Sequence, residues 1–448
     1  MQKERYSMKL QKKIEDRSAT VNVVGLGYVG LPLALEAARA GYRVNGIDLS
    51  QEKRELLAAN RSYVDDITSR EIAECRENEA FNATCDFSVV GRESDISIIC
   101  VPTPLDKFKQ PDLSYVESAT KSIAAHLHKG SLVVLESTTY PGTTQDIIAP
   151  LLEAGSGLKA GVDFHLAFSP ERVDPGNLRF RTKNTPKVVG GYTPQCAALT
   201  EAFYSSILDA PICLVASTKE AEACKILENT FRVVNCALAN EMAVLFHRMD
   251  IDLWDVIRAA STKPFGFMPF YPGPGVGGHC IPLDPFYLTY KAKQYNMHIR
   301  LIDLAGEVND AMPSYIIQRA MFILNERGKA LRGSNVMISG VTYKGDVSDT
   351  RESPSLELMQ MLLENGAHVS FHDPWCPELS VAGRNFKSQD LNPDLLASLD
   401  LIIVASGHKT KVNYRAMVDS GVPIFDTRNA VAPALGAPAG SLKNLIRL

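Results

Sequence analysis

Apolar residues gather in short runs that end at glycine or acidic residues, as in a parallel β-sheet flanked by helices. The first runs are a strand over residues 19–24, the turn Gly25-Leu-Gly-Tyr-Val-Gly30, a helical stretch over residues 31–40 and a second strand that closes on Asp48. A strand, glycine turn, helix and strand in this order form a βαβ unit. The pattern predicts a doubly wound α/β domain at the start of the chain.

The middle of the chain changes to a helical pattern. Residues 217–249 contain no glycine or proline and carry apolar residues at helical spacing, and a shorter helix is predicted over residues 254–260. The apolar positions of the long helix exceed what one neighbouring domain would cover. Because symmetric dimers are the common outcome for such a surface, we expect a homodimer.

The opening pattern then returns in altered form. A strand over residues 335–341, a helix over residues 355–365 and a strand that closes on Asp373 predict a second domain of the same type, without the GxGxxG spacing. The expected fold is α/β, with two Rossmann-like doubly wound domains joined by a long central helix and a helical middle domain. We expect domain boundaries at 1–216, 217–315 and 316–448.

Composition narrows the class of protein. The 448 residues are 45% hydrophobic and 22% charged, with a net charge of −4, so neither nucleic acid nor an anionic membrane is an expected partner. The start of the chain lacks an apolar signal core, and no apolar run is long enough to cross a bilayer. Nine scattered cysteines without a CxxC pair predict neither a metal site nor disulfides. A reduced, cytoplasmic protein is expected.

The first glycine turn has the pattern of a dinucleotide site. Gly25 would make the tight turn, Gly27 would let a pyrophosphate approach the backbone, and Gly30 would let the helix pack close to the strand. Asp48 would accept hydrogen bonds from the adenosine ribose and repel a 2′-phosphate, which favours NAD over NADP; the nearby Lys53 weakens that preference.

A second glycine-rich segment, from Tyr271 to Asp284, suggests covalent catalysis. Four glycines between Gly273 and Gly278 precede Cys280, and a carboxylate follows four residues later. A thiol at the end of such a loop suits a nucleophile. The alternative from these residues alone is a structural turn with a packed cysteine.

Several spaced motifs together resemble the UDP-sugar 6-dehydrogenase family, which includes UDP-glucose and UDP-N-acetylhexosamine dehydrogenases. The likeness runs from about Val21 to Arg428 and rests on these segments: Gly25–Gly30, Cys100-Val-Pro-Thr-Pro104, Ser137-Thr138, Ser169-Pro-Glu-Arg172, Lys225 with Asn229, Gly273–Asp284, Tyr343-Lys-Gly345 and Asp349-Thr-Arg-Glu-Ser353. The resemblance implies oxidation of the sugar C6 alcohol to a carboxylate with two NAD⁺ per substrate. It is closest to bacterial UDP-N-acetylglucosamine 6-dehydrogenases.

The resemblance also implies roles for single residues. Cys280 would form a thiohemiacetal and then a thioester, because an aldehyde must become tetrahedral before it loses a second hydride. The other implied catalytic residues are Lys225, Asp284, Glu171, Asn229 and Thr138. Lys225 read alone would be a solvated helix lysine, and Asp284 a cap of the following turn.

Two further sets of contacts follow from the same resemblance. NAD would contact Gly25, Gly27, Tyr28, Val29, Gly30, Asp48, Lys53, Thr103, Thr138 and Arg351. The UDP-sugar would contact Glu171, Arg172, Lys225, Asn229, Tyr271, Gly273, Gly275, Gly277, Tyr343, Lys344 and Arg428.

The sugar and the reaction stoichiometry stay open at this point. UDP-N-acetylglucosamine is the first expectation and UDP-glucose the second. The N-acetylmannosamine branch commonly carries an arginine where this chain reads Lys263-Pro-Phe-Gly. A two-electron alcohol dehydrogenase with a structural Cys280, and a non-enzymatic regulator that binds NAD and a UDP-sugar, are the rival hypotheses. The family resemblance suggests surface polysaccharide synthesis.

Overall fold

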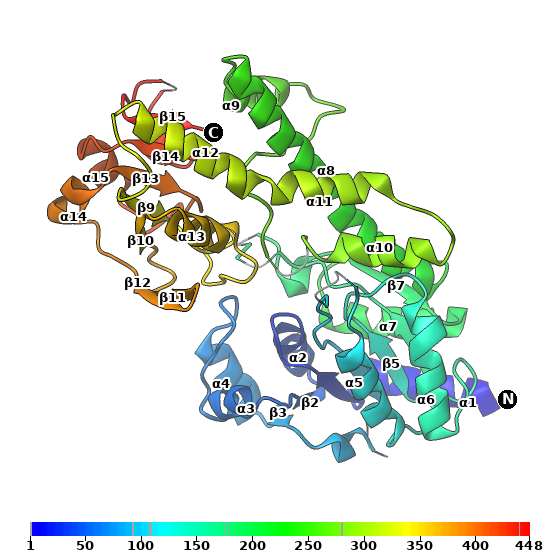
Figure 1. Ribbon diagram of the computed structural model, residues 1–448. Helices are drawn as coiled ribbons and strands as arrows, with labels where there is room; N and C mark the ends of the chain where they lie inside the picture. The colour runs from blue at the N-terminus through cyan, green and yellow to red at the C-terminus, as the bar shows by residue number, and fades with distance from the viewer. Residues whose placement is uncertain are drawn as a thin grey trace. The chain divides into compact units, whose positions relative to one another are not determined.

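The computed structural model describes residues 2–91, 94–106, 110–174, 176–177, 179–278, 281–438 and 440–448. His279 and Cys280 lie outside the described residues, so the role of Cys280 stays a prediction. The chain divides into two compact units (Figure 1). The first comprises Met1–Glu228 and Phe286–Met297, and the second comprises Asn229–Pro285 and His298–Leu448.

An eight-stranded sheet forms the centre of the first unit. Its strands are β1 (Thr20–Val24), β2 (Arg43–Ile47), β3 (Phe81–Thr84), β4 (Ile96–Ile99), β5 (Leu132–Leu135), β6 (His165–Phe168), β7 (Lys187–Gly191) and β8 (Ile212–Val215). They lie in the order β3-β2-β1-β4-β5-β6-β7-β8, with β6 and β7 antiparallel and the other neighbours parallel. The order reverses between β1 and β4, the position where doubly wound sheets bind ligands.

Helices flank this sheet in the first unit. They are α1 (Gln2–Glu15), α2 (Gly30–Arg39), α3 (Gln51–Ala58), α4 (Ser69–Glu77), α5 (Ser114–Ala124), α6 (Ala149–Ser156) and α7 (Pro194–Ile207), with the short turns η1 (Phe87–Val90), η2 (Thr144–Ile148) and η3 (Thr182–Asn184). The neighbouring residues Val133 and Val134 of β5 join different hydrophobic clusters. Because successive residues of a strand point to opposite faces, the sheet is buried on both faces.

The second unit has a smaller sheet of the same kind. Its strands are β9 (Asn335–Ser339), β10 (His368–His372), β13 (Leu401–Val404), β14 (Ile424–Asp426) and β15 (Leu445–Arg447). They run parallel in the order β10-β9-β13-β14-β15, and β11 (Glu378–Val381) pairs with β12 (Arg384–Lys387) as a separate hairpin. The order reverses between β9 and β13.

The helices of the second unit are α9 (Leu253–Ala260), α11 (Arg300–Asp310), α12 (Met312–Asn325), α13 (Pro354–Glu364), α14 (Pro393–Ser398), α15 (Tyr414–Asp419) and α16 (Val431–Ala434). Two helices contribute residues to both units, α8 (Thr218–Arg248) and α10 (Asp284–Lys293). Figure 1 shows α8 as a long continuous green helix, as the uninterrupted helical pattern predicts.

The predicted fold class is confirmed: both units are α/β, and helical segments separate the two sheets along the chain. The expected boundaries at residues 216 and 315 stay predictions, and the compact units divide the chain elsewhere, inside α8 and α10. No helix among the described residues combines the length and apolarity needed to cross a membrane.

Candidate active site

The glycine turn between β1 and α2 has the close packing that its motif predicts. Gly25 has φ of 93°, and a Cβ there would lie 2.6 Å from the carbonyl oxygen of Cys100. A Cβ on Gly30 would lie 1.9 Å from the carbonyl oxygen of Gly25. Both positions therefore require glycine. Gly27 differs, because an added Cβ there meets nothing within 4 Å.

The start of α2 is open to an anion. Among the described residues no side chain caps this helix, and its first turn holds no acidic residue. Tyr28 and Val29, in the turn itself, are half-buried. Uncapped N–H groups at a helix start bind phosphate oxygens, and the helix dipole adds to that attraction. This arrangement fits the pyrophosphate of a dinucleotide.

Asp48 closes the turn from the end of β2. Its Oδ2 accepts a hydrogen bond from the Leu26 amide (2.9 Å) and lies 3.0 Å from the Lys53 ammonium. Its Oδ1 accepts a hydrogen bond from the Ser50 amide (2.9 Å). Lys53 is thus an ion-pair partner of Asp48. The carboxylate keeps lone pairs for ribose hydroxyls, since an ionised carboxylate offers about four acceptor sites.

Thr103 and Thr138 lie after neighbouring strands of the first sheet. Thr103 follows β4, and its carbonyl oxygen accepts a hydrogen bond from the Tyr287 hydroxyl. Thr138 follows β5 and is half-buried. Because β4 and β5 are parallel neighbours, both threonines lie at the carboxyl edge of the sheet, where ligands bind in such folds.

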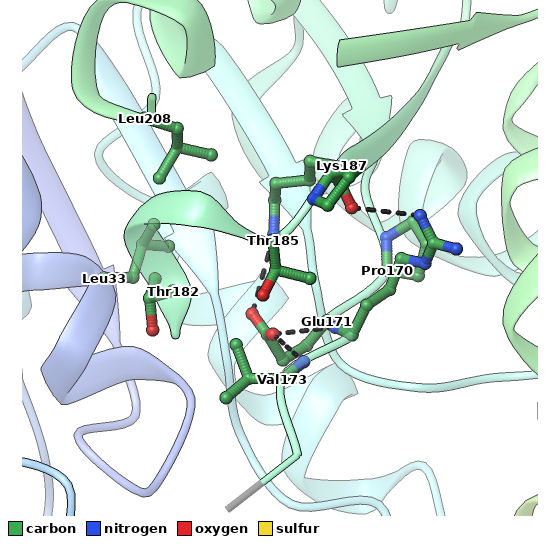
Figure 2. Close-up of a pocket in the computed structure, with 10 residues that line it drawn as sticks. Leu33, Pro170, Glu171, Val173, Thr182, Thr185, Lys187 and Leu208 are labelled. Carbon is green, nitrogen blue, oxygen red and sulfur yellow. Dashed lines mark hydrogen bonds and ion pairs between the residues drawn. The ribbon is translucent and has the colours of Figure 1, made fainter. Parts of the chain in front are cut away.

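Glu171, after β6, is held at both its carboxylate and its main chain. Its Oε1 accepts hydrogen bonds from the amides of Arg172 (2.7 Å) and Val173 (2.6 Å), and its Oε2 lies 3.6 Å from the ammonium of Lys187. Figure 2 shows the carboxylate directed toward these groups. The carbonyl oxygen of Glu171 accepts a hydrogen bond from Lys225 Nζ at 2.6 Å. Lys225 therefore contacts Glu171 and is more than a solvated helix lysine.

Three buried polar residues behind Glu171 were not predicted from the sequence. Lys187 Nζ lies 3.0 Å from Glu136 Oε1, which also accepts a hydrogen bond from the Tyr204 hydroxyl. Burial raises the pKa of Glu136. Burial alone would lower the pKa of Lys187, but the carboxylates of Glu136 and Glu171 raise it. Lys187 is thus a buried cation between two carboxylates.

Three remaining predicted residues also have polar partners: Arg172 after β6, Asn229 on α8 and Asp284 on α10. Arg172 forms an ion pair with Glu228, with 2.6 Å between Nη2 and Oε1. Asn229 donates from Nδ2 to Asp284 Oδ2 at 2.5 Å. Asp284 is the first residue of α10 and is 4% exposed.

A cavity of about 520 Å³ lies at the carboxyl edge of the second sheet, a volume typical of small-molecule sites. Three of its lining residues are predicted substrate contacts: Tyr343, Lys344 and Arg428. Burial lowers the pKa of Arg428 to about 10, which still leaves the guanidinium charged at neutral pH. The two cations suit a diphosphate.

The glycine loop packs closely around the same residues. A Cβ on Gly273 would lie 2.2 Å from Arg428 Nη1, and a Cβ on Gly277 would lie 2.6 Å from the carbonyl oxygen of Glu352. Gly275 has φ of 134°, which side chains rarely adopt. A side chain at any of these three positions would therefore clash or strain the backbone, and Gly273 is the position that lies against Arg428.

Two predicted contacts lie outside this cavity lining. Arg351 is exposed and bound to Asp349, with Nε 2.9 Å and Nη2 2.6 Å from the carboxylate. Tyr271 is 54% exposed and stacks on Trp254, with ring centroids 5.8 Å apart.

The cavity also has lining residues that were not predicted: Ser406, Gly407, His408 and Lys409. They follow β13 directly, at the point where the strand order reverses. Because Leu401–Val404 is an apolar run typical of a buried strand, the general rule for ligand sites at strand ends could have found them.

The eight described cysteines are free. Burial raises the pKa of the thiols of Cys75, Cys100, Cys224, Cys236 and Cys376. Cys85 and Cys213 are exposed. No group of three or more residues able to hold a metal ion occurs within the described ranges.

A dinucleotide turn on one sheet and a cationic cavity on another define an oxidoreductase that takes a nucleotide-linked substrate. Three models of one family match nearly the whole chain: the NAD binding domain of the UDP-glucose/GDP-mannose dehydrogenase family at residues 19–208, its central domain at 219–311 and its UDP binding domain at 337–433. The chain belongs to this family and is an NAD-dependent nucleotide-sugar dehydrogenase.

Similar proteins agree with this assignment. The UDP-N-acetyl-D-glucosamine 6-dehydrogenase of Pseudomonas aeruginosa is 39% identical, covering 79% of this chain and 82% of its own. The Salmonella typhi protein of the same name is 37% identical, covering 87% and 90%. A solved UDP-D-ManNAc dehydrogenase from Pyrococcus horikoshii has a TM-score of 0.85 and 33% identity, covering 96% of this chain and 98% of its own.

Proposed function

We propose that this chain oxidises the C6 alcohol of UDP-N-acetylglucosamine to the carboxylate, in two two-electron steps, through a thiohemiacetal and a thioester on Cys280. The cavity of the second unit carries this proposal, because it brings Tyr343, Lys344 and Arg428 together in a space that suits a nucleotide. The identity of the substrate sugar is supported by the names of the two bacterial relatives at 39% and 37% identity.

Bound NAD⁺ would accept the hydride that leaves C6 in each oxidation. The turn from Gly25 to Gly30, the start of α2 and Asp48 would hold the dinucleotide. Thr103, Thr138 and Arg351 would complete its contacts. This assignment uses the open surface at Gly27, where a side chain would occupy the space that a phosphate needs.

The residues around the sugar would act on protons and charge. Asp284, hydrogen-bonded to Asn229, would orient a water or accept a proton. Lys225 would stabilise an oxyanion with its ammonium group, which already donates to a carbonyl oxygen in this structure. Glu171 would accept the proton of the water that hydrolyses the thioester. Its carboxylate is held ready by two backbone amides.

UDP-N-acetylmannosamine is the second candidate substrate, since the P. horikoshii structure of that specificity matches this chain over 96% of its length. UDP-glucose is a further alternative. The segment Lys263–Tyr271, just ahead of the glycine loop, is where we expect the discrimination to arise. Its exposed side chains include Phe265 (72% exposed) and Met268 (63% exposed).

A panel of UDP-sugars assayed for NADH release tests the reaction and the substrate together. UDP-N-acetylglucosamine should give the highest kcat/KM and two NADH per sugar consumed. One NADH per sugar would contradict the four-electron reaction, and none would contradict turnover of that sugar. Cys280→Ser should abolish the second oxidation, whereas full turnover by this variant would contradict the covalent route.

We also propose that the protein is a homodimer that pairs through α8. Phe231, Leu238 and Leu245 are spaced seven residues apart on this helix and are 49%, 54% and 45% exposed. A heptad stripe of exposed apolar residues is typical of a helix that packs against a partner helix. Light scattering of the eluted protein should give the dimer mass, and Leu238→Glu should give the monomer; a monomeric wild type would contradict the proposal.

A further inference from the structure

Lys187 is the only one of the three buried residues behind Glu171 that contacts its carboxylate directly in the described structure. It is the first residue of β7, and its side chain is only 7% exposed. A lysine is rarely this buried unless it is paired. Here it lies 3.0 Å from Glu136 and 3.6 Å from Glu171.

Glu136 and Tyr204 fix the position of this lysine. The Glu136 side chain is 0% exposed, and its Oε1 accepts from both the Tyr204 hydroxyl and the Lys187 ammonium. The ammonium also lies 4.9 Å from the centre of the Tyr204 ring. These two contacts restrict the orientation of the Lys187 side chain, so its ammonium group points toward Glu171.

The space beside this contact suits a water molecule. A cavity of about 10 Å³, room for about one water, is lined by Glu171, Lys187 and neighbouring residues (Figure 2). Glu171 Oε1 already accepts two backbone amides, whereas the separation of Oε2 from Lys187 exceeds hydrogen-bond length. Oε2 is therefore the oxygen with acceptor capacity left for a proton.

We propose that Lys187 is a positioning residue for thioester hydrolysis, which keeps the Glu171 carboxylate in place and directed for proton transfer while Glu136 holds the lysine. This inference rests on the proposed function. In the step concerned, water oxygen bonds to the acyl carbon as one water proton passes to Glu171. The C–S bond then breaks, its electron pair returns to sulfur, and the carboxylic acid product loses its proton to solvent.

Replacing Lys187 by methionine keeps the length of the side chain and removes its charge. Hydrolysis should slow while both oxidations proceed. We expect a rapid burst approaching two NADH per active site, followed by a kcat about 10- to 100-fold below that of the wild type, which is less than the whole contribution of a general base. Intact-protein mass spectrometry should show the acyl-enzyme accumulating. The kcat/KM for each substrate should stay within about threefold of the wild-type value, because KM falls together with kcat when hydrolysis limits turnover.

Three further variants separate positioning from folding. Lys187→Arg keeps the charge and should recover most of the rate. The double variant Glu136→Gln/Lys187→Met removes both buried charges, so it should regain thermal stability relative to Lys187→Met and yet still accumulate acyl-enzyme. Lys183→Met, at an exposed lysine four residues earlier, should behave as wild type.

The outcomes distinguish this inference from the proposed function. If the wild type releases two NADH per sugar but Lys187→Met and the double variant turn over without a burst or an acyl-enzyme, the role of Lys187 is contradicted and the four-electron reaction stands. If the wild type itself does not release two NADH, the proposed function fails and this inference fails with it.

Discussion

The two sheets use the same βαβ pattern to prepare different ligand sites. In the first unit α2 begins at Gly30, at the end of the turn that starts with Gly25, so the helix start itself faces the ligand edge. In the second unit α13 begins only at Pro354, well after the turn at Gly340. The cavity of the second unit is lined instead by side-chain cations. The N–H groups at a helix start can bind a pyrophosphate. Two cationic side chains can bind a diphosphate where no helix start is available.

The acidic residues that follow the second strand of each sheet, Asp48 after β2 and Asp373 after β10, also differ in their contacts. Asp48 is 9% exposed and bonded to the Leu26 amide, with Lys53 beside it. Asp373 is 0% exposed and accepts from the Val341 amide (2.7 Å) and from His408 Nε2 (3.1 Å). The Asp373 carboxylate is thus bound by a backbone amide and by a buried histidine. We therefore expect the strand-terminal acid to contact the ligand in the first unit, whereas in the second unit it is an acceptor for protein groups.

The largest expected effect comes from a matched pair of glycine substitutions. Gly30→Ala would place its Cβ 1.9 Å from a backbone oxygen, and Gly345→Ala would place its Cβ 2.1 Å from the carbonyl oxygen of Gly407. Each substitution should lower the affinity for the nucleotide of its own sheet more than about 100-fold, because the backbone around the ligand must shift. Titration calorimetry with NAD⁺ and with UDP should show that Gly30→Ala impairs mainly NAD⁺ and Gly345→Ala mainly UDP.

Gly27→Ala is the control for this pair, since its added Cβ meets nothing within 4 Å. Its melting temperature should equal that of the wild type, while NAD⁺ binds more weakly. Equal loss of both nucleotides in either clashing variant would contradict separate sites.

Arg428→Met should have the next largest effect. Loss of a charge-assisted contact to a diphosphate costs about 1.5–3 kcal/mol, or about 10- to 150-fold in UDP affinity. NAD⁺ affinity should be unchanged. Arg384→Met, at an exposed arginine of the separate β12 hairpin, provides the control and should bind both nucleotides normally. Unchanged UDP binding by Arg428→Met would remove Arg428 from the substrate contacts.

Replacing the two strand-terminal acids, Asp48 and Asp373, by asparagine should distinguish an effect on cofactor binding from an effect on the free energy of unfolding. Asp48→Asn should lower the affinity for NAD⁺ by about tenfold, since a hydrogen-bonded contact of about 1.5 kcal/mol is lost. It should also reduce the preference for NAD⁺ over NADP⁺, since the charge that repels the 2′-phosphate is lost. Asp373→Asn should leave that preference unchanged and lower the free energy of unfolding by about 2 kcal/mol. Affinities for both cofactors and urea unfolding measure the two effects; the reverse pattern would contradict the comparison.

The smallest expected effect is a difference in pH response. Burial raises the pKa of Glu222, which accepts from the Thr144 amide, to about 7. Its folded-state pKa therefore exceeds the unfolded value near 4.3, so the first unit should gain about 1–2 kcal/mol as pH falls from about 7.5 toward 5.

The contribution of Asp373 to stability depends on pH in the opposite direction to that of Glu222. Burial alone would raise its pKa, but the hydrogen bond and charge of His408 lower it. Its stabilisation should persist at pH 5 and be lost only as pH falls through the lowered value. Thermal unfolding of the wild type and of Glu222→Gln between pH 8 and 5 shows whether Glu222 makes the protein more stable as pH falls. A Glu222→Gln protein that keeps the full pH dependence would contradict it.

Local patterns predicted the elements that carry both sites. The strand β1 agrees with the predicted strand over residues 19–24 within one residue, and α8 agrees with its predicted range within one residue at each end. Alternating apolar runs and helix-breaking glycines act over a few residues, so they can be recognised in one sequence. Arg428 could be named because the family resemblance extends to it.

The buried residues around Glu171 could not be predicted in that way. Glu136 precedes Lys187 by about fifty residues, and neither residue belongs to a repeated pattern. Their contact depends on how strands from separate segments assemble into the sheet. His408 likewise reads as an isolated histidine until β13 places it beside Asp373.

The buried thiols have a consequence for chemical labelling. A thiolate reacts with alkylating reagents and a neutral thiol does not, so raised pKa values protect Cys75, Cys100 and Cys376 at neutral pH. Cys85 and Cys213 are the exposed competitors among the described cysteines. Serine at those two positions would remove the exposed competitors, and an electrophilic probe would then test whether substrate protects Cys280.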